Sequence, residues 1–138
     1  MRMQGVAPGE ATPHTAVVFD ETAADALATA QALSAAGFDT QVAESPPSTQ
    51  TSSTVAAILG TPHADVAVWN VSPALSAYCA HLEQLLDRHS FHGVKLIVVT
   101  TNAPKVREYF GARCSGMEVL QKPVSTAVLL KAVWRIGP

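Results

Sequence analysis

The stretch Asp65-Val-Ala-Val-Trp-Asn70 holds a continuous apolar run between two polar residues. A short run of β-branched and aromatic side chains is typical of a central parallel strand that is covered on both faces. In open α/β sheets, ligands and reacting groups lie just beyond the carboxyl ends of such strands. Asn70 is therefore predicted to occupy a position where a functional group belongs.

The composition indicates one globular domain with few charges. The chain has 138 residues, of which 48% are hydrophobic and 14% charged, and its formal net charge is −2. This length suits a single domain with one core. A weakly negative chain is not attracted to nucleic acid or to an anionic membrane, and no apolar run approaches the roughly 20 residues of a membrane span. We expect no nucleic-acid partner and no membrane partner.

Neither the start of the chain nor its cysteines indicate export. The N-terminus lacks the charged-then-apolar order of a secretory signal, and Cys79 and Cys114 form no CxxC motif. We expect both cysteines to be packing residues rather than a disulfide, and the protein to be cytoplasmic. Residues 1–14 are rich in Gly, Pro and small polar residues, which predicts a flexible tail before a domain over residues 15–138.

Short apolar runs alternate with helical patterns along that domain. The predicted strands are Thr15–Phe19, Phe38–Ala43, Asp65–Asn70, Val94–Val99 and Met117–Leu120. The predicted helices are Ala23–Ala36, Thr54–Leu59, Ala77–His89, Pro104–Phe110 and Ser125–Ile136. This alternation predicts a doubly wound, five-stranded parallel sheet with five helices, a flavodoxin-like α/β sandwich of three layers.

Details of the boundaries follow from single residues. Gly37 is the stop signal of the first helix, and the polar segment Glu44–Ser53, which contains two prolines, is predicted to be a loop. The inward face of the last helix is predicted to consist of Val128, Leu129, Ala132, Val133 and Ile136.

Polar side chains gather at the carboxyl edge of this predicted sheet. Asp20 and Glu21 follow the first strand, and Asn70 ends the third. Thr100 follows the fourth strand and Lys122 the fifth. Because parallel strands end at the same edge, two carboxylates, an amide, a hydroxyl and an ammonium are expected to form one site.

The order and spacing of four motifs carry a family resemblance. The motifs are Val-Val-Phe-Asp-Glu (17–21), Asp-Val-Ala-Val-Trp-Asn (65–70), Leu-Ile-Val-Val-Thr-Thr (96–101) and Gln-Lys-Pro-Val (121–124). Thr100 follows Asn70 by 30 residues, and Lys122 follows Thr100 by 22. From about Thr15 to Pro138, the chain resembles the receiver domains of two-component response regulators, the chemotaxis-type phosphoacceptor family.

The resemblance implies a role for each residue at the edge. In that family an acidic pair and an aspartate hold Mg²⁺, the aspartate takes a phosphoryl group, and a threonine and a lysine bind the phosphoryl oxygens. By position, Asp20 and Glu21 correspond to the acidic pair, Thr100 to the threonine and Lys122 to the lysine. Asn70 stands where the phosphoacceptor aspartate belongs.

An asparagine at that position changes the chemistry. An acyl phosphate needs a carboxylate nucleophile, which an amide oxygen does not replace. A unit charge at about 4 Å contributes roughly 4 kcal/mol at an effective dielectric near 20, so loss of one carboxylate weakens Mg²⁺ binding. Two further departures from the family pattern are Val119, at the position of the switch aromatic, and Pro73, which follows residue 70 by three residues instead of four. We therefore expect an atypical receiver that is not phosphorylated.

Simpler roles remain open for the same residues. Asp20 and Glu21 can cap the following helix or pair with Lys122, and they can also hold Mg²⁺ weakly. The Thr100 hydroxyl can bind nearby backbone. His81, His89 and His92 have no cysteine or carboxylate at metal-binding spacing, so we expect no zinc site and no other cofactor.

The expected function is binding rather than catalysis. The chain ends at Pro138 directly after the last predicted helix, so we expect no output domain. By analogy with receivers, another signalling protein or a second copy is expected to bind the face formed by the segments 104–110, 117–120 and 125–136. Its expected contact residues are Lys105, Arg107, Tyr109, Arg113, Lys131 and Arg135. The alternatives are a receiver still switched by Mg²⁺, a phosphoryl group or a small ligand, and a flavodoxin-like protein that binds a small molecule.

Overall fold

A single parallel sheet organises the chain. The computed structural model describes residues 14–43, 47–60, 63–71 and 75–134. Five strands form the sheet in the order β2-β1-β3-β4-β5. They are β1 (Thr15–Phe19), β2 (Asp39–Val42), β3 (Val66–Val71), β4 (Lys95–Thr100) and β5 (Met117–Gln121). The predicted flavodoxin-like α/β class is confirmed.

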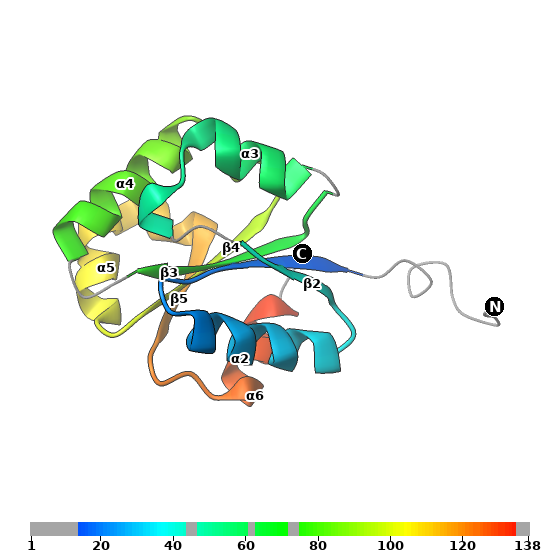
Figure 1. The fold of residues 1–138 in the computed structure, drawn as a ribbon. Helices are drawn as coiled ribbons and strands as arrows, with labels where there is room; N and C mark the ends of the chain where they lie inside the picture. Colours follow the sequence, from blue (N-terminus) through cyan, green and yellow to red (C-terminus); the bar gives the residue numbers. More distant parts are fainter. Residues whose placement is uncertain (1–13, 44–46, 61–62, 72–74, 135–138) are drawn as a thin grey trace.

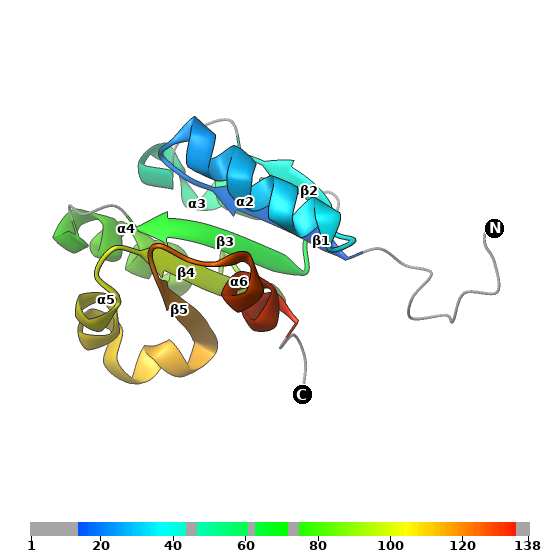
Figure 2. The same cartoon turned by 90° about the horizontal axis from the view of Figure 1, so that it is seen from below.

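Helices cover both faces of this sheet (Figure 1). Helices α2 (Ala23–Ala35) and α6 (Thr126–Val133) pack on one face, and Figure 2, which is seen from that side, shows both of them in front of the strands. Helices α3 (Ser52–Gly60), α4 (Leu75–Asp87) and α5 (Ala103–Phe110) pack on the other face. Within the described residues, no helix is long and apolar enough to cross a membrane.

Strand β3 lies at the centre, and all of its residues are buried. Val66 and Val68 belong to the core beneath α2 and α6, whereas Ala67 and Trp69 belong to the core beneath α3, α4 and α5. This alternation follows from the two-residue period of a strand. Asn70 is the next residue on the α2/α6 side.

Trp69 anchors the larger of the two cores and is 1% exposed. Its ring lies 4.7 Å from that of Phe19, 5.6 Å from that of Phe91 and 6.3 Å from that of His81, measured between centroids. An aromatic cluster of this kind fixes β1 and β3 against α4 and the turn that follows it.

The predicted loop over residues 44–53 is partly helical. A short 3₁₀ helix, η1, covers Pro47–Thr49, and α3 begins at Ser52, two residues earlier than predicted. The Thr51 hydroxyl accepts a hydrogen bond from the backbone N–H of Thr54 at 3.2 Å, so Thr51 caps the start of α3. Residues 44–46 lie outside the described residues.

The last helix presents a narrower apolar face than predicted. Leu129, Ala132 and Val133 are buried, but Val128 is 49% exposed, and Ile136 lies outside the described residues. Helical positions one residue apart differ by about 100°, so Val128 falls off the stripe that the other three residues define. The prediction that Val128 faces the core was wrong.

Two further segments differ from the prediction, one at His14 and one after α5. Residues 1–13 of the predicted tail lie outside the described residues, but His14 packs against the domain. Its ring centroid is 5.8 Å from that of Phe38 and 5.4 Å from that of Trp134. The 3₁₀ helix η2 (Gly111–Gly116), which the sequence did not predict, follows α5.

Candidate functional site

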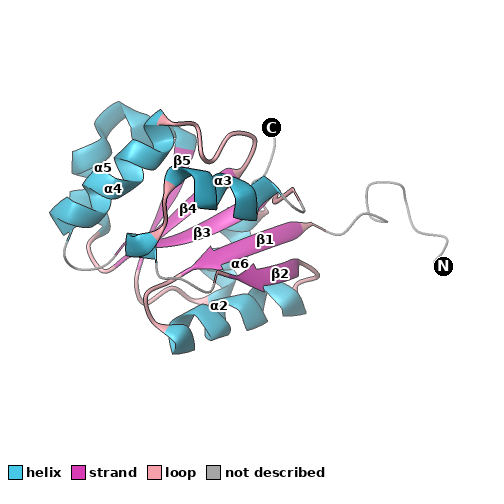
Figure 3. Cartoon of the chain, turned by 45° about the horizontal axis from the view of Figure 1, so that its top comes forward, coloured by secondary structure: helices cyan, strands magenta, loops and turns pink. Residues whose placement is uncertain are grey.

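A cavity of about 420 Å³ opens at the carboxyl edge of the sheet, toward which the strand arrows point in Figure 3. It lies between α2 and the segment that follows β5. Its lining residues are Asp20, Asp25, Ala28, Thr29, Val68, Asn70, Val99, Thr101, Lys122, Pro123 and Val124. Three of the predicted site residues, Asp20, Asn70 and Lys122, therefore come together in one cavity.

Asn70 contributes a buried amide to this cavity. It is 6% exposed, and Phe19 of β1 pairs with Trp69 of β3, so Asp20 and Asn70 follow on neighbouring strands. Within the described part of the chain, the Asn70 side chain makes no hydrogen bond. A side-chain amide offers both donors and an acceptor, so these atoms are available to a molecule in the cavity.

Asp20 stands beside the start of α2. One carboxylate oxygen, Oδ1, accepts the backbone N–H of Thr22 at 3.0 Å, which is close to the predicted capping role. Burial raises the pKa of Asp20, and the Thr22 hydrogen bond and the Lys122 charge only partly oppose that rise. The negative charge of Asp20 is therefore only partly balanced by the groups around it.

Glu21 does not line the same cavity. The Tyr78 hydroxyl of α4 donates a hydrogen bond to Glu21 Oε1, on the other side of the sheet from α2 and α6. Glu21 instead borders a second hollow with Leu27 and Val42. Asp20 lines both hollows, whereas Glu21 lines only the second.

Lys122 pairs with a residue that the sequence analysis did not identify. Its Nζ lies 3.8 Å from Oδ2 of Asp25, in the first turn of α2. The ion pair predicted with Asp20 or Glu21 was wrong in its partner, because Asp25 reaches the ammonium from the helix above the cavity. The backbone N–H of Lys122 donates to the carbonyl of Thr100 at 2.7 Å, which fixes the position of the lysine.

Thr101, rather than Thr100, lines the cavity. Thr100 is fully buried, and its hydroxyl accepts the backbone N–H of Asn102 at 3.2 Å, the simpler role left open for it. Along β4, Val98 faces α5 and Val99 faces the cavity, so the alternation turns Thr100 away from it.

Gln121 is a site-shaping residue that the sequence analysis missed. Its Oε1 accepts the N–H of Ala103 at 2.8 Å, and its Nε2 donates to the carbonyls of Thr101 at 2.7 Å and Lys122 at 3.0 Å. This amide joins the β4–α5 connection to the end of β5. Gln121 begins the Gln-Lys-Pro-Val motif, but the motif does not indicate this role, since the pairing depends on two segments that meet only in the fold.

Val119, at the position of the switch aromatic, is 7% exposed and belongs to the core beneath α5. Its backbone carbonyl oxygen accepts a hydrogen bond from Nη2 of Arg107 at 2.9 Å. An aromatic ring at this position could point either into the core or toward the solvent. The smaller aliphatic side chain of Val119 is packed in the core and has no such outward position. Pro73 lies outside the described residues.

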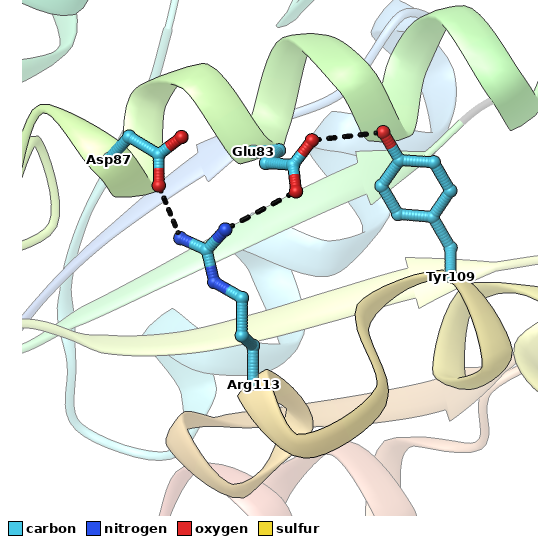
Figure 4. A network of polar contacts seen from close by, with 4 residues as sticks. All are labelled: Glu83, Asp87, Tyr109 and Arg113. Atoms are coloured by element: carbon cyan, nitrogen blue, oxygen red, sulfur yellow. Dashed lines mark hydrogen bonds and ion pairs between the residues drawn. The ribbon is translucent and has the colours of Figure 1, made fainter.

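The predicted contact surface is not continuous. Figure 4 shows Tyr109 and Arg113 turned toward α4. The Tyr109 hydroxyl donates to Glu83 at 3.1 Å, and Arg113 contacts Glu83 at 3.4 Å and Asp87 at 2.9 Å. These contacts join Tyr109 and Arg113 to α4, and the role of both residues in partner binding stays a prediction.

The remaining predicted contact residues have different environments. Lys105 lies 3.6 Å from Glu108 on α5, so its charge is partly compensated. Lys131 is exposed on α6, and within the described residues it has no ion-pair partner. Arg135 lies outside those residues.

Comparisons with known proteins establish the class of fold. No family model and no curated protein matches the chain. Among solved structures, the chemotaxis protein CheY4 of Vibrio cholerae matches with a TM-score of 0.69 and 15% identity, over 91% of this chain and 100% of that one. A response regulator of Thermotoga maritima matches with a TM-score of 0.67 and 22% identity, over 91% and 98%.

A CheY-like receiver domain of Methylobacillus flagellatus gives a TM-score of 0.66 at 17% identity, over 91% of this chain and 100% of that one. The fold is therefore the CheY-like receiver fold. At such identities the likeness establishes the fold alone.

The side chains in the cavity do not fit the Mg²⁺ that this fold implies. Magnesium requires a compact, near-octahedral set of oxygen ligands in which carboxylates carry the charge. Asp20 is the one member of the acidic pair that lines the cavity, Asn70 is neutral, and Asp25 is held by Lys122. Within the described residues, no group of three or more His, Cys, Asp or Glu side chains could hold a metal.

Proposed function

We propose that this chain is an atypical receiver module that acts in signal transduction by binding another protein, without phosphorylation at the end of β3 and without catalysis. The observation that carries the proposal is Asn70, a buried amide beside Asp20 and Lys122. The fold supports a signalling role, because its structural neighbours are response-regulator receivers.

The hydrogen bonds of Glu21 and Thr100 support the absence of phosphorylation. Phosphoryl transfer to a carboxylate depends on a metal that neutralises the developing charge. Here Glu21 is engaged by Tyr78 and Thr100 by Asn102, so two of the side chains that would assist transfer face elsewhere. These contacts favour the non-phosphorylated module over a receiver switched by Mg²⁺ or a phosphoryl group.

The proposed binding surface is the face formed by α5, β5 and α6. Its exposed residues include Lys105, the apolar Val128 at 49% exposure, and Lys131. An apolar side chain beside uncompensated lysine charge suits a partner with an acidic rim around a small apolar patch.

Phosphorylation is tested with acetyl phosphate and phosphoramidate in the presence of Mg²⁺, followed by intact-mass measurement. We expect no phosphorylated species. A species heavier by one phosphoryl group that disappears in Asn70→Ala would refute the proposal, because Asn70 would then be the acceptor.

Partner binding is tested by affinity capture from a lysate of the source organism with the wild type, with Lys131→Glu and Val128→Ser together, and with Arg88→Glu as the matched control. Arg88 is exposed at the end of α4, away from the proposed face. We expect a specific partner to be lost with the double variant and retained with the control. Loss with the control alone would place the interface elsewhere.

A further inference from the structure

The inner wall of the cavity at the carboxyl edge is aliphatic. Val68 and Val99, at 3% and 8% exposure, form its buried side, and Ala28 and Val124 line it as well. Small-molecule sites usually enclose roughly 300–1,000 Å³ and are lined mainly by apolar side chains with a few convergent polar groups. The volume of about 420 Å³ lies in that range. Aliphatic walls contribute little to the binding of a hydrated ion, so they favour an organic molecule in the cavity.

A buried polar side chain in the same cavity indicates where the polar part of such an occupant would lie. Asn70 is 6% exposed, and within the described residues its amide has no hydrogen-bond partner. The amide lines the cavity, where it can donate hydrogen bonds to a ligand and accept them from it.

The charged side chains at the rim of the cavity determine whether a positive or a negative ligand is favoured. Lys122 and Asp25 face each other at 3.8 Å, so the Lys122 charge is shared and balances the Asp20 carboxylate only in part. Burial raises the pKa of Asp20, and the Thr22 hydrogen bond and the Lys122 charge do not fully offset that rise. A cation beside Asp20 would be attracted, whereas an anion would meet two carboxylates and a lysine already in use.

We propose that the cavity binds a small organic cation, a primary or secondary ammonium on a compact apolar body. The ammonium would donate hydrogen bonds to the Asp20 carboxylate and to the Asn70 carbonyl oxygen, and the body would pack against Val68 and Val99. This inference does not depend on the proposed protein-binding function, since it involves the cavity and not the α5–β5–α6 face.

The proposal is tested by titrating ¹⁵N-labelled protein with three ligands of one shape and different head groups: benzylamine, benzyl alcohol and benzoate. We expect benzylamine to give saturable shifts of the Asn70 side-chain amide and to bind at least about tenfold more tightly than the other two. Mg²⁺ is titrated separately. Equal binding of all three ligands, no binding of benzylamine, or Mg²⁺ shifts at lower concentration than benzylamine would overturn the proposal.

Matched variants locate the binding. Asp20→Asn keeps the shape and removes the charge, so it is expected to weaken benzylamine binding about tenfold. Ala28→Phe fills the cavity from an exposed position of α2 and is expected to abolish binding without unfolding the domain. Leu27→Ala, an exposed neighbour that borders the second hollow, is the control with unchanged affinity. Unchanged binding in both Asp20→Asn and Ala28→Phe would contradict the assigned location.

Discussion

Asn70 is the penultimate residue of the central strand β3 and lines the same cavity as Asp20 and Lys122. An amide there is neutral at every pH, so it adds no repulsion to the Asp20 carboxylate. A carboxylate at the same place would bring two negative charges together in a partly desolvated site. Asparagine at position 70 therefore favours the stability of this edge of the sheet, and the same residue lacks the nucleophilic carboxylate.

Asn70→Asp tests this argument. We expect the substitution to lower the free energy of unfolding at pH 7 by about 1–3 kcal/mol, since it buries a charge without a sufficient partner. The loss should shrink as the pH falls and the new carboxyl group is protonated. Urea unfolding at pH 7 and at pH 5 measures both effects, with Asn70→Ser as a neutral control. A loss of equal size at both pH values would show that shape, not charge, is responsible.

Asp20→Asn makes the complementary prediction. Because burial raises the folded-state pKa of Asp20, its ionised form destabilises the fold, and this penalty vanishes below the ordinary carboxyl pKa of 3.8. Asparagine can still accept the Thr22 N–H. We expect a higher melting temperature than the wild type at pH 7 and no difference at pH 3. The exposed position Asp39 supplies Asp39→Asn as a control for the loss of one charge, and a gain at pH 3 would contradict the argument.

The sequence located Asp20, Asn70 and Lys122 at one edge because each follows a readable apolar run. It assigned Thr100 to the site, whereas Thr101 lines the cavity, because two consecutive threonines leave the phase of the strand undetermined. It also could not reveal the direction of Glu21, whose hydrogen-bond partner Tyr78 lies 57 residues further along the chain.

At the scale of the elements, the strands and helices position the cavity through their ends. The β4–α5 connection and the end of β5 are joined by the Gln121 side chain, which bonds to Ala103, Thr101 and Lys122. Asn102 caps α5 by accepting the N–H of Lys105 at 3.3 Å. These contacts hold Thr101 and Lys122 in place, and they do not require a bound ligand.

Gln121→Met tests the role of this amide. The substitution keeps the approximate size of the side chain and removes its three hydrogen bonds, so we expect a loss of about 1–2 kcal/mol in unfolding free energy. Amide hydrogen exchange at Ala103 should accelerate beyond that global loss, because its backbone N–H loses its acceptor. Gln84→Met, on the exposed surface of α4, is the matched control. Unchanged exchange at Ala103 would refute the assigned contact.

The limits of the elements were less predictable than their type. Each predicted strand and helix is present, but α3 begins within the predicted loop and η2 was missed. A threonine cap and a glycine at positive φ, Gly111 at 55°, decide these boundaries, and both are local features that hydrophobic periodicity does not record.

At the scale of the whole molecule, two cores share one sheet. Trp69 lies in the core beneath α3, α4 and α5. Trp134 lies on the other face of the sheet, at the end of α6, and is 49% exposed. Its ring contacts that of Phe38 on the same face, with ring centroids 4.9 Å apart. Because β1, β3 and β4 contribute residues to both cores, neither core can persist without the sheet.

Two single-tryptophan variants test this coupling. Trp69→Phe retains Trp134, and Trp134→Phe retains Trp69, so each variant reports one side of the sheet by fluorescence. In each variant we expect the urea transition followed by fluorescence to coincide with that followed by circular dichroism, as in a two-state domain of this size. Distinct fluorescence and circular-dichroism midpoints within one variant would show that the two layers unfold separately.

The inactivity of the cavity toward phosphoryl chemistry is the central claim, and calorimetric titration of the wild-type chain with beryllofluoride in the presence of Mg²⁺ tests it most directly. Beryllofluoride reports an intact phosphoacceptor site because it forms its bond to a carboxylate. We expect no saturable heat for the wild type. Saturable binding that disappears in both Asn70→Ala and Asp20→Asn would contradict the account, because the cavity would then hold the metal and the phosphoryl mimic together.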